Sequence, residues 1–223
     1  MATLACLLAF GSAGFAGTII GTIRGQGPPG ASQAGPAGKY ESRKYKFADR
    51  ILYTDLKDFV VFIDEPSDQG SISTNKIPIV TQKDATFRPH VLPVRVGTTV
   101  EWPNEDDIFH NVFSISESNP FDLGLYKHPS IKEKRFATPG RVDVFCAIHR
   151  DMHCIVLVLE TPYFAVADQK NRYAITNVPA GKYRLKGWQE RLPSRTNEVI
   201  VPENGEVRVD FILGFSDPAR ESP

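Results

Sequence analysis

Apolar residues in this chain fall in short runs that are separated by turn residues. Six runs are rich in β-branched and aromatic residues, and several of them alternate with polar positions; they cover residues 17–23, 59–63, 98–102, 141–145, 155–159 and 207–211. Gly, Pro, Asn or Asp lie between the runs, which is typical of strands joined by turns. No long segment has the period of a helix. The sequence therefore predicts an all-β chain built from sandwiches.

Three breaks in this pattern suggest how the chain is divided. Residues 25–38 are mostly Gly, Pro, Ala, Ser and Gln and predict a flexible loop. A turn-rich segment at 65–70 and the break at 160–162 enclose a central part. We therefore expect a signal segment at 1–16, a central segment at 71–159 that is flanked by 17–65 and 160–214, and a tail at 215–223.

The N-terminal segment 1–16 is apolar and ends in Gly14-Phe15-Ala16, which is similar to the small-residue cleavage site of an export signal. Cys6 lies in this segment, with too few apolar residues before it for a lipoprotein acylation site. No later apolar stretch approaches the ~20 residues that span a bilayer. These features predict a periplasmic or secreted protein without a membrane span after the N-terminal segment.

Overall charge gives no indication of a charged partner. The chain has 26 Lys and Arg residues and 26 Asp and Glu residues, so its formal net charge is zero. Binding to nucleic acid usually requires an excess of basic residues, which this chain does not have, so we expect no nucleic-acid partner. A short acidic cluster, Glu105-Asp106-Asp107, is interpreted either as a docking rim for a redox partner or as an ordinary polar turn.

Candidate metal ligands are concentrated in the run from Phe145 to Met152. Cys146, His149 and Met152 follow one another at intervals of three residues, and a further imidazole lies upstream at His110. Thiolate and thioether sulfur combined with imidazole nitrogen select copper, and two His with one Cys and a weak axial Met describe a blue-copper electron-transfer site. The candidate ligands for one Cu(I)/Cu(II) ion are therefore His110, Cys146, His149 and Met152.

Strand alternation is compatible with this site. It directs Val142, Val144 and Cys146 toward one face of a strand and Asp143 toward the other. His149 and Met152 would then follow in a tight loop. His110 must come from a different strand.

Other nearby residues allow other interpretations. Cys146, His149, His153 and Cys154 are four nitrogen and sulfur donors that could bind structural zinc. Adjacent strand residues point to opposite faces, however, so we expect Cys154 in the core and His153 outside it. His90 is expected to be a packing or surface histidine and His128 a solvated one.

The central segment resembles the cupredoxin family. Residues 87–106 followed by His110-Asn111-Val112 are similar to the cupredoxin order of strand, Gly turn, strand, Asn-x-Asp loop and first copper histidine. Pro139-Gly140 and the Cys-x2-His-x2-Met spacing resemble its second half. The resemblance implies a Greek-key sandwich. It also implies that Asn111 supports the site by hydrogen bonding to the ligand loops and the Cys146 sulfur.

The flanking segments resemble a different family. Residues 167–175, 178–185 and 205–211 are similar to the carboxypeptidase regulatory-like, prealbumin-type β-sandwich, whose opening strands would lie at 17–23 and 59–63. The cupredoxin part would then be inserted in this sandwich or packed beside it, an arrangement that resembles methylamine-utilisation-protein-like cupredoxins. Its aromatic residues are expected to serve core and inter-domain packing, namely Tyr163, Phe164, Tyr173, Tyr183 and Trp188.

Together these observations predict an exported one-electron carrier with an unidentified redox partner protein, and not an enzyme. The first alternative is a copper-binding or structural surface protein without electron transfer. The second is an enzyme of the multicopper oxidase or nitrite reductase type, which would need a further copper centre built from additional histidines. The chain has five His and no His-x-His pair.

Overall fold

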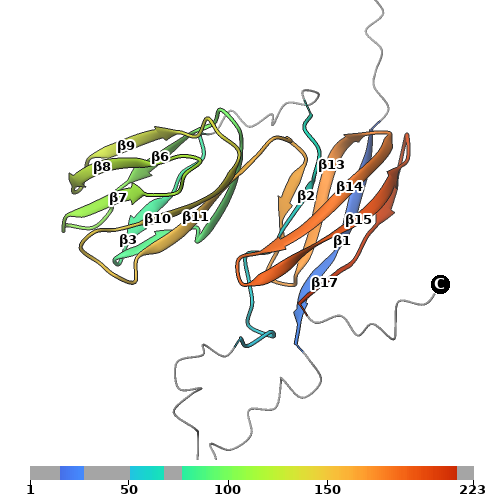
Figure 1. Ribbon diagram of the computed structural model, residues 1–223, viewed down its shortest axis with the longest axis horizontal. Helices are drawn as coiled ribbons and strands as arrows, with labels where there is room; N and C mark the ends of the chain where they lie inside the picture. The colour runs from blue at the N-terminus through green and yellow to red at the C-terminus, as the bar shows by residue number, and fades with distance from the viewer. Residues whose placement is uncertain (1–15, 28–50, 68–76, 215–223) are drawn as a thin grey trace, which may run out of the picture.

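The computed structural model describes residues 16–27, 51–67 and 77–214, and these form strands without any helix (Figure 1). The all-β prediction is confirmed. Across the described ranges there is accordingly no helix with the length and hydropathy needed to cross a membrane. The strands are β1 (Ala16–Gln26), β2 (Val60–Ile63), β3 (Thr81–Lys83), β4 (Thr86–Arg88), β5 (Val91–Arg95), β6 (Thr99–Pro103), β7 (His110–Ser114), β8 (Phe121–Tyr126), β9 (Ile131–Arg135), β10 (Gly140–Phe145), β11 (His153–Leu159), β12 (Phe164–Val166), β13 (Arg172–Pro179), β14 (Gly181–Gln189), β15 (Leu192–Val201), β16 (Glu206–Arg208) and β17 (Phe211–Gly214).

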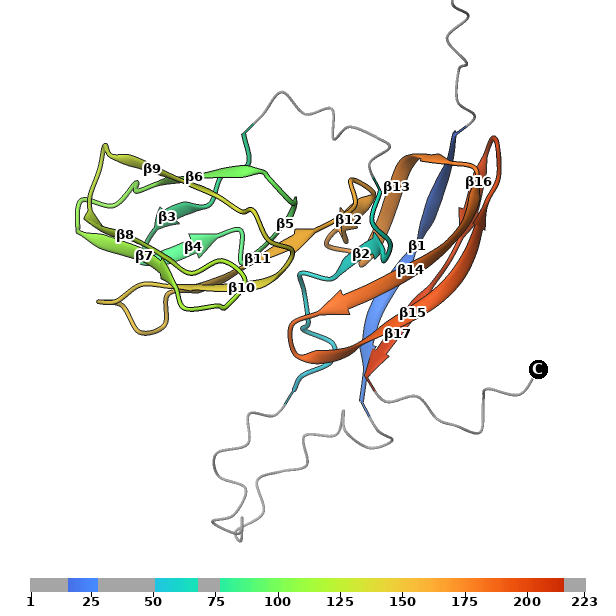
Figure 2. The same cartoon turned by 45° about the horizontal axis from the view of Figure 1, so that its top comes forward.

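The strands form two sandwiches that lie side by side (Figures 1 and 2). One combines the sheet β13-β1-β16, in which β17 also pairs with β1, with the sheet β12-β2-β14-β15. The other has a five-stranded sheet, β5-β11-β10-β7-β8, and two two-stranded ribbons, β3-β4 and β6-β9. Isolated bridges at Ile79 and Gln82 connect the two ribbons. Each sandwich has its own buried core. The core of the second contains only residues between Val80 and Val158, whereas that of the first is drawn from both sides of this segment.

A third apolar cluster joins the two sandwiches. In β11, Cys154, Val156 and Val158 face the core of the second sandwich, whereas the alternate residues Ile155, Leu157 and Leu159 face the first. Strand β2 is also buried on both faces, with Val60 and Phe62 in the joining cluster. Burial on both faces explains why 59–63 and 155–159 are apolar without interruption.

The aromatic residues of the first sandwich pack as predicted. Tyr163 and Tyr173 lie in its core, and Tyr183 packs against it. Phe164 and Trp188 pack against the joining cluster.

Replacing Ile155 with alanine is expected to lower the free energy of unfolding by about 2–5 kcal/mol, because its side chain is fully buried where the sandwiches meet. Urea unfolding followed by circular dichroism measures this change. Ile200→Ala, on a side chain that is 72% exposed, is the matched control and should change the value by less than about 0.5 kcal/mol. Equal effects of the two substitutions would contradict the assigned packing.

Two strands differ from the sequence prediction. Strand β1 extends to Gln26, into the predicted loop 25–38, because its last four residues pair with β17. The predicted strand 207–211 is divided into β16 and β17. Between them the carboxylate of Asp210 accepts hydrogen bonds from the backbone N–H and hydroxyl of Thr22, at 2.7 and 2.9 Å, and this side-chain contact interrupts the ladder.

Some predictions fall on parts of the chain that lie outside the described residues. These are the signal segment except Ala16, most of the loop 25–38, and the tail 215–223.

Candidate metal centre

His110 is the first residue of β7 and is fully buried. The turn before it is shaped by Asn104, whose side-chain oxygen accepts a hydrogen bond from the Asp106 N–H at 2.8 Å. The Asn104 amide donates to the carbonyl oxygens of Ile108 and Tyr126, both at 3.0 Å. These bonds tie the turn to β8 and place the Asp106 carboxylate beside the His110 ring.

Asp106 determines how His110 presents its two nitrogens. Its Oδ2 lies 2.7 Å from His110 Nε2, and the carboxylate also accepts hydrogen bonds from the N–H groups of Asp84 and Ala85. Partial burial would raise the pKa of Asp106, but the hydrogen bonds from Ala85, His110 and Asp84 lower it below its ordinary value. The ionised carboxylate favours a proton on Nε2, which leaves the lone pair of Nδ1 available to a metal.

Cys146 and His149 lie on the loop that connects β10 and β11. The Cys146 N–H donates to the Met152 carbonyl at 3.2 Å, and the Met152 N–H donates to the His149 carbonyl at 3.1 Å. These two bonds close the loop tightly. Val142 and Val144 of β10 and Cys146, directly after it, are buried on one face, as strand alternation predicts, and Asp143 is more exposed.

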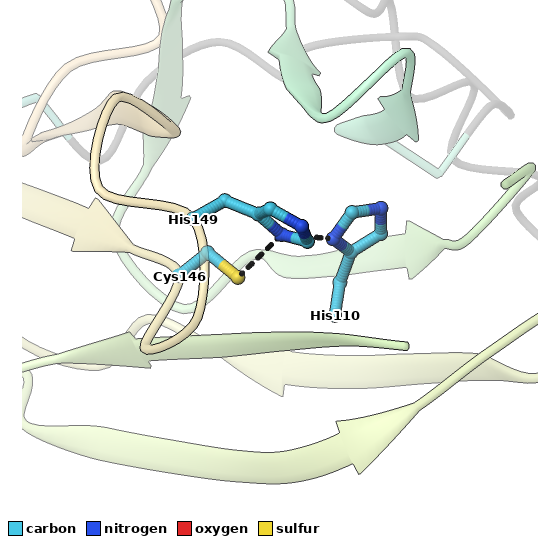
Figure 3. A group of neighbouring side chains, drawn as sticks. All are labelled: His110, Cys146 and His149. Atoms are coloured by element: carbon cyan, nitrogen blue, oxygen red, sulfur yellow. Dashed lines mark hydrogen bonds between the residues drawn. The ribbon is translucent and has the colours of Figure 1, made fainter. Parts of the chain in front are cut away.

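The three side chains converge although they come from distant segments (Figure 3). His110 Nδ1 lies 3.0 Å from His149 Nδ1, and the latter lies 3.6 Å from Cys146 Sγ. Ligand atoms of all three lie within 4.8 Å of one another. Two nitrogens at about 2.0–2.1 Å from one ion and 120° apart would be separated by about 3.5 Å. The observed nitrogen separation is about 0.5 Å shorter, at hydrogen-bond distance. The three donors are close enough to share one metal ion, and sulfur with two imidazole nitrogens is a donor set for copper or zinc.

Met152 and Asn111 also lie in this region. The Met152 side chain is 1% exposed and belongs to the same core as Cys146. The backbone N–H of Asn111 donates to Cys146 Sγ at 3.5 Å. The Asn111 side chain does not make this contact, because its amide donates to Asp122 of β8 at 2.6 Å.

The sequence reasoning missed two supporting residues. The sequence places Asp106 in an acidic cluster and in the Asn-x-Asp turn without predicting its contact with His110, although its position four residues before His110 is a usable signal. Tyr126 is paired with His110 in the sheet, receives a hydrogen bond from Gln82 and donates to the Trp102 carbonyl. Burial raises the pKa of Tyr126 by more than the hydrogen bond from Gln82 lowers it, and the nearby Cys146 raises it further, so its phenol stays protonated.

The four-residue zinc site is not assembled. Cys154 is fully buried in the core, and burial raises the pKa of its thiol well above the ordinary value. A thiol in this state is a poor metal ligand. His153 points to the other face of β11, with its Nε2 2.9 Å from Asp143 Oδ1. His90 and His153 come together with Glu190, and His128 is exposed.

Replacing Asp106 with alanine is expected to weaken copper binding about 10- to 100-fold, because His110 loses the partner that orients its ring and fixes its proton. Competition with a copper chelator measures the affinity. Asp107→Ala changes the exposed neighbouring carboxylate and is the matched control. If both variants bind copper as the native chain does, Asp106 has no role at the site.

Comparison with known proteins identified no matching family model and no matching curated protein. Several solved structures are similar. A Cu-containing nitrite reductase (NirK) from Thermus scotoductus SA-01 is 30% identical with a TM-score of 0.37, and the match covers 44% of this chain and 26% of the reductase. The chain thus spans about a quarter of that protein.

Two smaller proteins are matched over almost their whole length. A purple cupredoxin from Nitrosopumilus maritimus is 23% identical with a TM-score of 0.33, and the match covers 37% of this chain and 99% of the cupredoxin. A reduced, Cu(I) form of an amicyanin variant is 22% identical with a TM-score of 0.36, and the match covers 44% of this chain and 98% of amicyanin. Each of these matches leaves more than half of the present chain without a counterpart.

Proposed function

We propose that this chain is a mononuclear type 1 copper protein that carries one electron between partners. The ligands would be His110, Cys146 and His149, with Met152 in the axial position. The observation that supports this proposal most strongly is the convergence of one sulfur and two imidazole nitrogens from β7 and the β10–β11 loop. A thiolate, a thioether and imidazoles form a donor set that suits copper.

When bound, copper would supply a one-electron couple between Cu(I) and Cu(II). The role of the chain is to hold the ligands in the same arrangement for both charge states of the copper ion. His110 is fixed by Asp106, and Cys146 is fixed by the Asn111 N–H and by the bonds that close its loop. Ligands held in this way on a rigid sheet move little when the charge changes, which favours electron transfer.

A surface for the redox partner would surround the histidines. Ile108 and Phe109, directly before His110, are 50% and 51% exposed, and Ile148, directly before His149, is 52% exposed. Leu125, which pairs with Asn111, is 60% exposed. Exposed apolar residues around a site suit transient docking of another protein. The apolar N-terminal segment 1–16 supports the further proposal that the carrier acts in the periplasm or outside the cell.

Voltammetry of the copper-loaded chain, combined with metal analysis before and after repeated reduction and oxidation, tests this function. The proposal predicts a reversible one-electron couple with one copper retained per chain. A chain that binds copper but releases it on reduction, or that shows no reversible couple, would instead be a copper-binding or structural protein.

Replacing Met152 with leucine is expected to raise the reduction potential, because the axial ligand tunes the potential of such sites and an alkyl side chain donates no electrons to stabilise Cu(II). Voltammetry measures the shift. Ile148→Leu, an exposed change in the same loop, is the matched control and should leave the potential unchanged. An unchanged or lowered potential in the Met152 variant would rule out an axial thioether.

A further inference from the structure

A second cluster of metal-binding side chains lies where the two sandwiches meet. His90 lies in the turn between β4 and β5, His153 begins β11, and Glu190 lies in the turn between β14 and β15 of the other sandwich. Ligand atoms of the three lie within 4.8 Å of one another. Two imidazoles and one carboxylate form a donor set that binds divalent first-row transition ions.

Each imidazole can offer a lone pair to an ion. Both ring nitrogens of His90 face acceptors, because Nδ1 lies 3.3 Å from the backbone carbonyl of His153 and Nε2 lies 3.0 Å from a Glu190 carboxylate oxygen. A neutral imidazole carries one proton, so it can donate to only one of these two acceptors. In the tautomer that donates to the carbonyl, a metal ion bound by both Nε2 and the Glu190 oxygen would satisfy the remaining pair.

His153 is oriented for the same role. Its Nε2 lies 2.9 Å from Asp143 Oδ1, so the proton on Nε2 is held by a carboxylate and Nδ1 is the available donor. Asp143 is itself bound by Arg141 through two hydrogen bonds at 2.9 and 2.7 Å. A carboxylate that holds the second nitrogen of a histidine is the usual support of a metal-binding imidazole. The Phe145 ring stacks on His153 with a centroid distance of 4.9 Å and further limits its rotation.

The cluster is accessible from solvent, and a further carboxylate lies near it. The side chains of His90, His153 and Glu190 are 35%, 26% and 21% exposed, so an ion could enter from solvent and the side chains could adjust. Asp58 lies close enough to interact electrostatically with both His90 and Glu190.

We propose that His90, His153 and Glu190 form a second metal site, for a divalent ion such as Zn²⁺ or Cu²⁺, that links the two sandwiches. Two ligands come from one sandwich and one from the other, so a bound ion would cross-link them. An ion that binds only the folded arrangement also stabilises it. This site does not depend on the proposed copper centre, from which it differs in all of its ligands.

Zinc binding to the full chain tests this proposal, with Zn²⁺ itself as the probe. Isothermal titration and metal analysis after gel filtration are expected to give one zinc equivalent in the Cys146→Ser chain, in which the copper site lacks its thiolate. Adding Glu190→Gln or His90→Gln should weaken this binding at least 100-fold and abolish the zinc-dependent rise in Tm. His128→Gln, which changes an exposed histidine outside the cluster, is the control and should retain both.

A measurement on the native chain tests the second site without any substitution. In nuclear magnetic resonance spectra of the unaltered chain loaded with diamagnetic Cu(I), Zn²⁺ should shift the ring resonances of His90 and His153 and leave those of His128 unchanged. Absence of a zinc equivalent in the Cys146→Ser chain, or binding that persists unchanged after Glu190→Gln, would overturn the second site. Either result would leave the copper proposal intact.

Discussion

Replacing Cys146 with alanine is expected to abolish the intense visible absorption of the Cu(II)-loaded protein. Such absorption arises from charge transfer between a thiolate and copper, and Cys146 supplies the sulfur in the His110, Cys146 and His149 group. The substitution removes one small side chain, so the two histidines should still bind Cu(II) weakly. Visible and electron paramagnetic resonance spectra of the loaded variant are therefore expected to show a colourless Cu(II) site.

Cys154→Ala is the matched control for this experiment. Cys154 is a free, buried cysteine like Cys146, but it is not part of the group with His110 and His149, and burial raises the pKa of its thiol so that it stays protonated. The Cys154 variant should keep its colour, with at most a modest loss of stability from the small cavity. Colour that survives in the Cys146 variant and disappears in the Cys154 variant would reverse the assignment.

Replacing His110 with alanine is expected to have the second largest effect. The imidazole is fully buried and supplies Nδ1 to the site, so its removal deletes a ligand and leaves the Asp106 carboxylate without its partner. We expect copper affinity to fall by more than the 10- to 100-fold loss typical of changing a supporting residue. The free energy of unfolding should fall by about 1–3 kcal/mol because a polar group loses its hydrogen bond.

A double-variant cycle distinguishes the loss of a ligand from general damage to the fold. If Asp106 acts on copper only through His110, the double variant of His110→Ala and Asp106→Ala should bind copper no more weakly than His110→Ala alone. Chelator competition measures the three affinities, and circular dichroism confirms that each variant is folded. Additive losses would mean that Asp106 affects copper by another route.

Much of this architecture could be predicted from local sequence. The apolar runs at 59–63 and 155–159 correspond to β2 and β11, and alternation gives the inward direction of Cys146. Features set by contacts between distant segments could not be predicted. The division between β16 and β17 depends on Asp210 meeting Thr22, 188 residues away in the sequence.

The same limit applies to the candidate sites. The Cys-x2-His-x2-Met spacing is local, so the loop ligands could be proposed from the sequence, and His110 followed from the Asn-x-Asp turn before it. The contact between His90 and Glu190 joins residues 100 positions apart and exists only because the two sandwiches pack together. No periodicity or motif contains that information. Likewise, the bond from the Asn111 side chain to Asp122 depends on the pairing of β7 with β8.

The spectrum of the native chain loaded with one equivalent of Cu(II) tests the central claim most directly. Convergence of His110, His149 and the Cys146 thiolate on one ion predicts a strong visible charge-transfer band, together with an electron paramagnetic resonance signal in which the copper spin is shared with sulfur. A native chain that binds Cu(II) stoichiometrically and stays colourless would contradict the account.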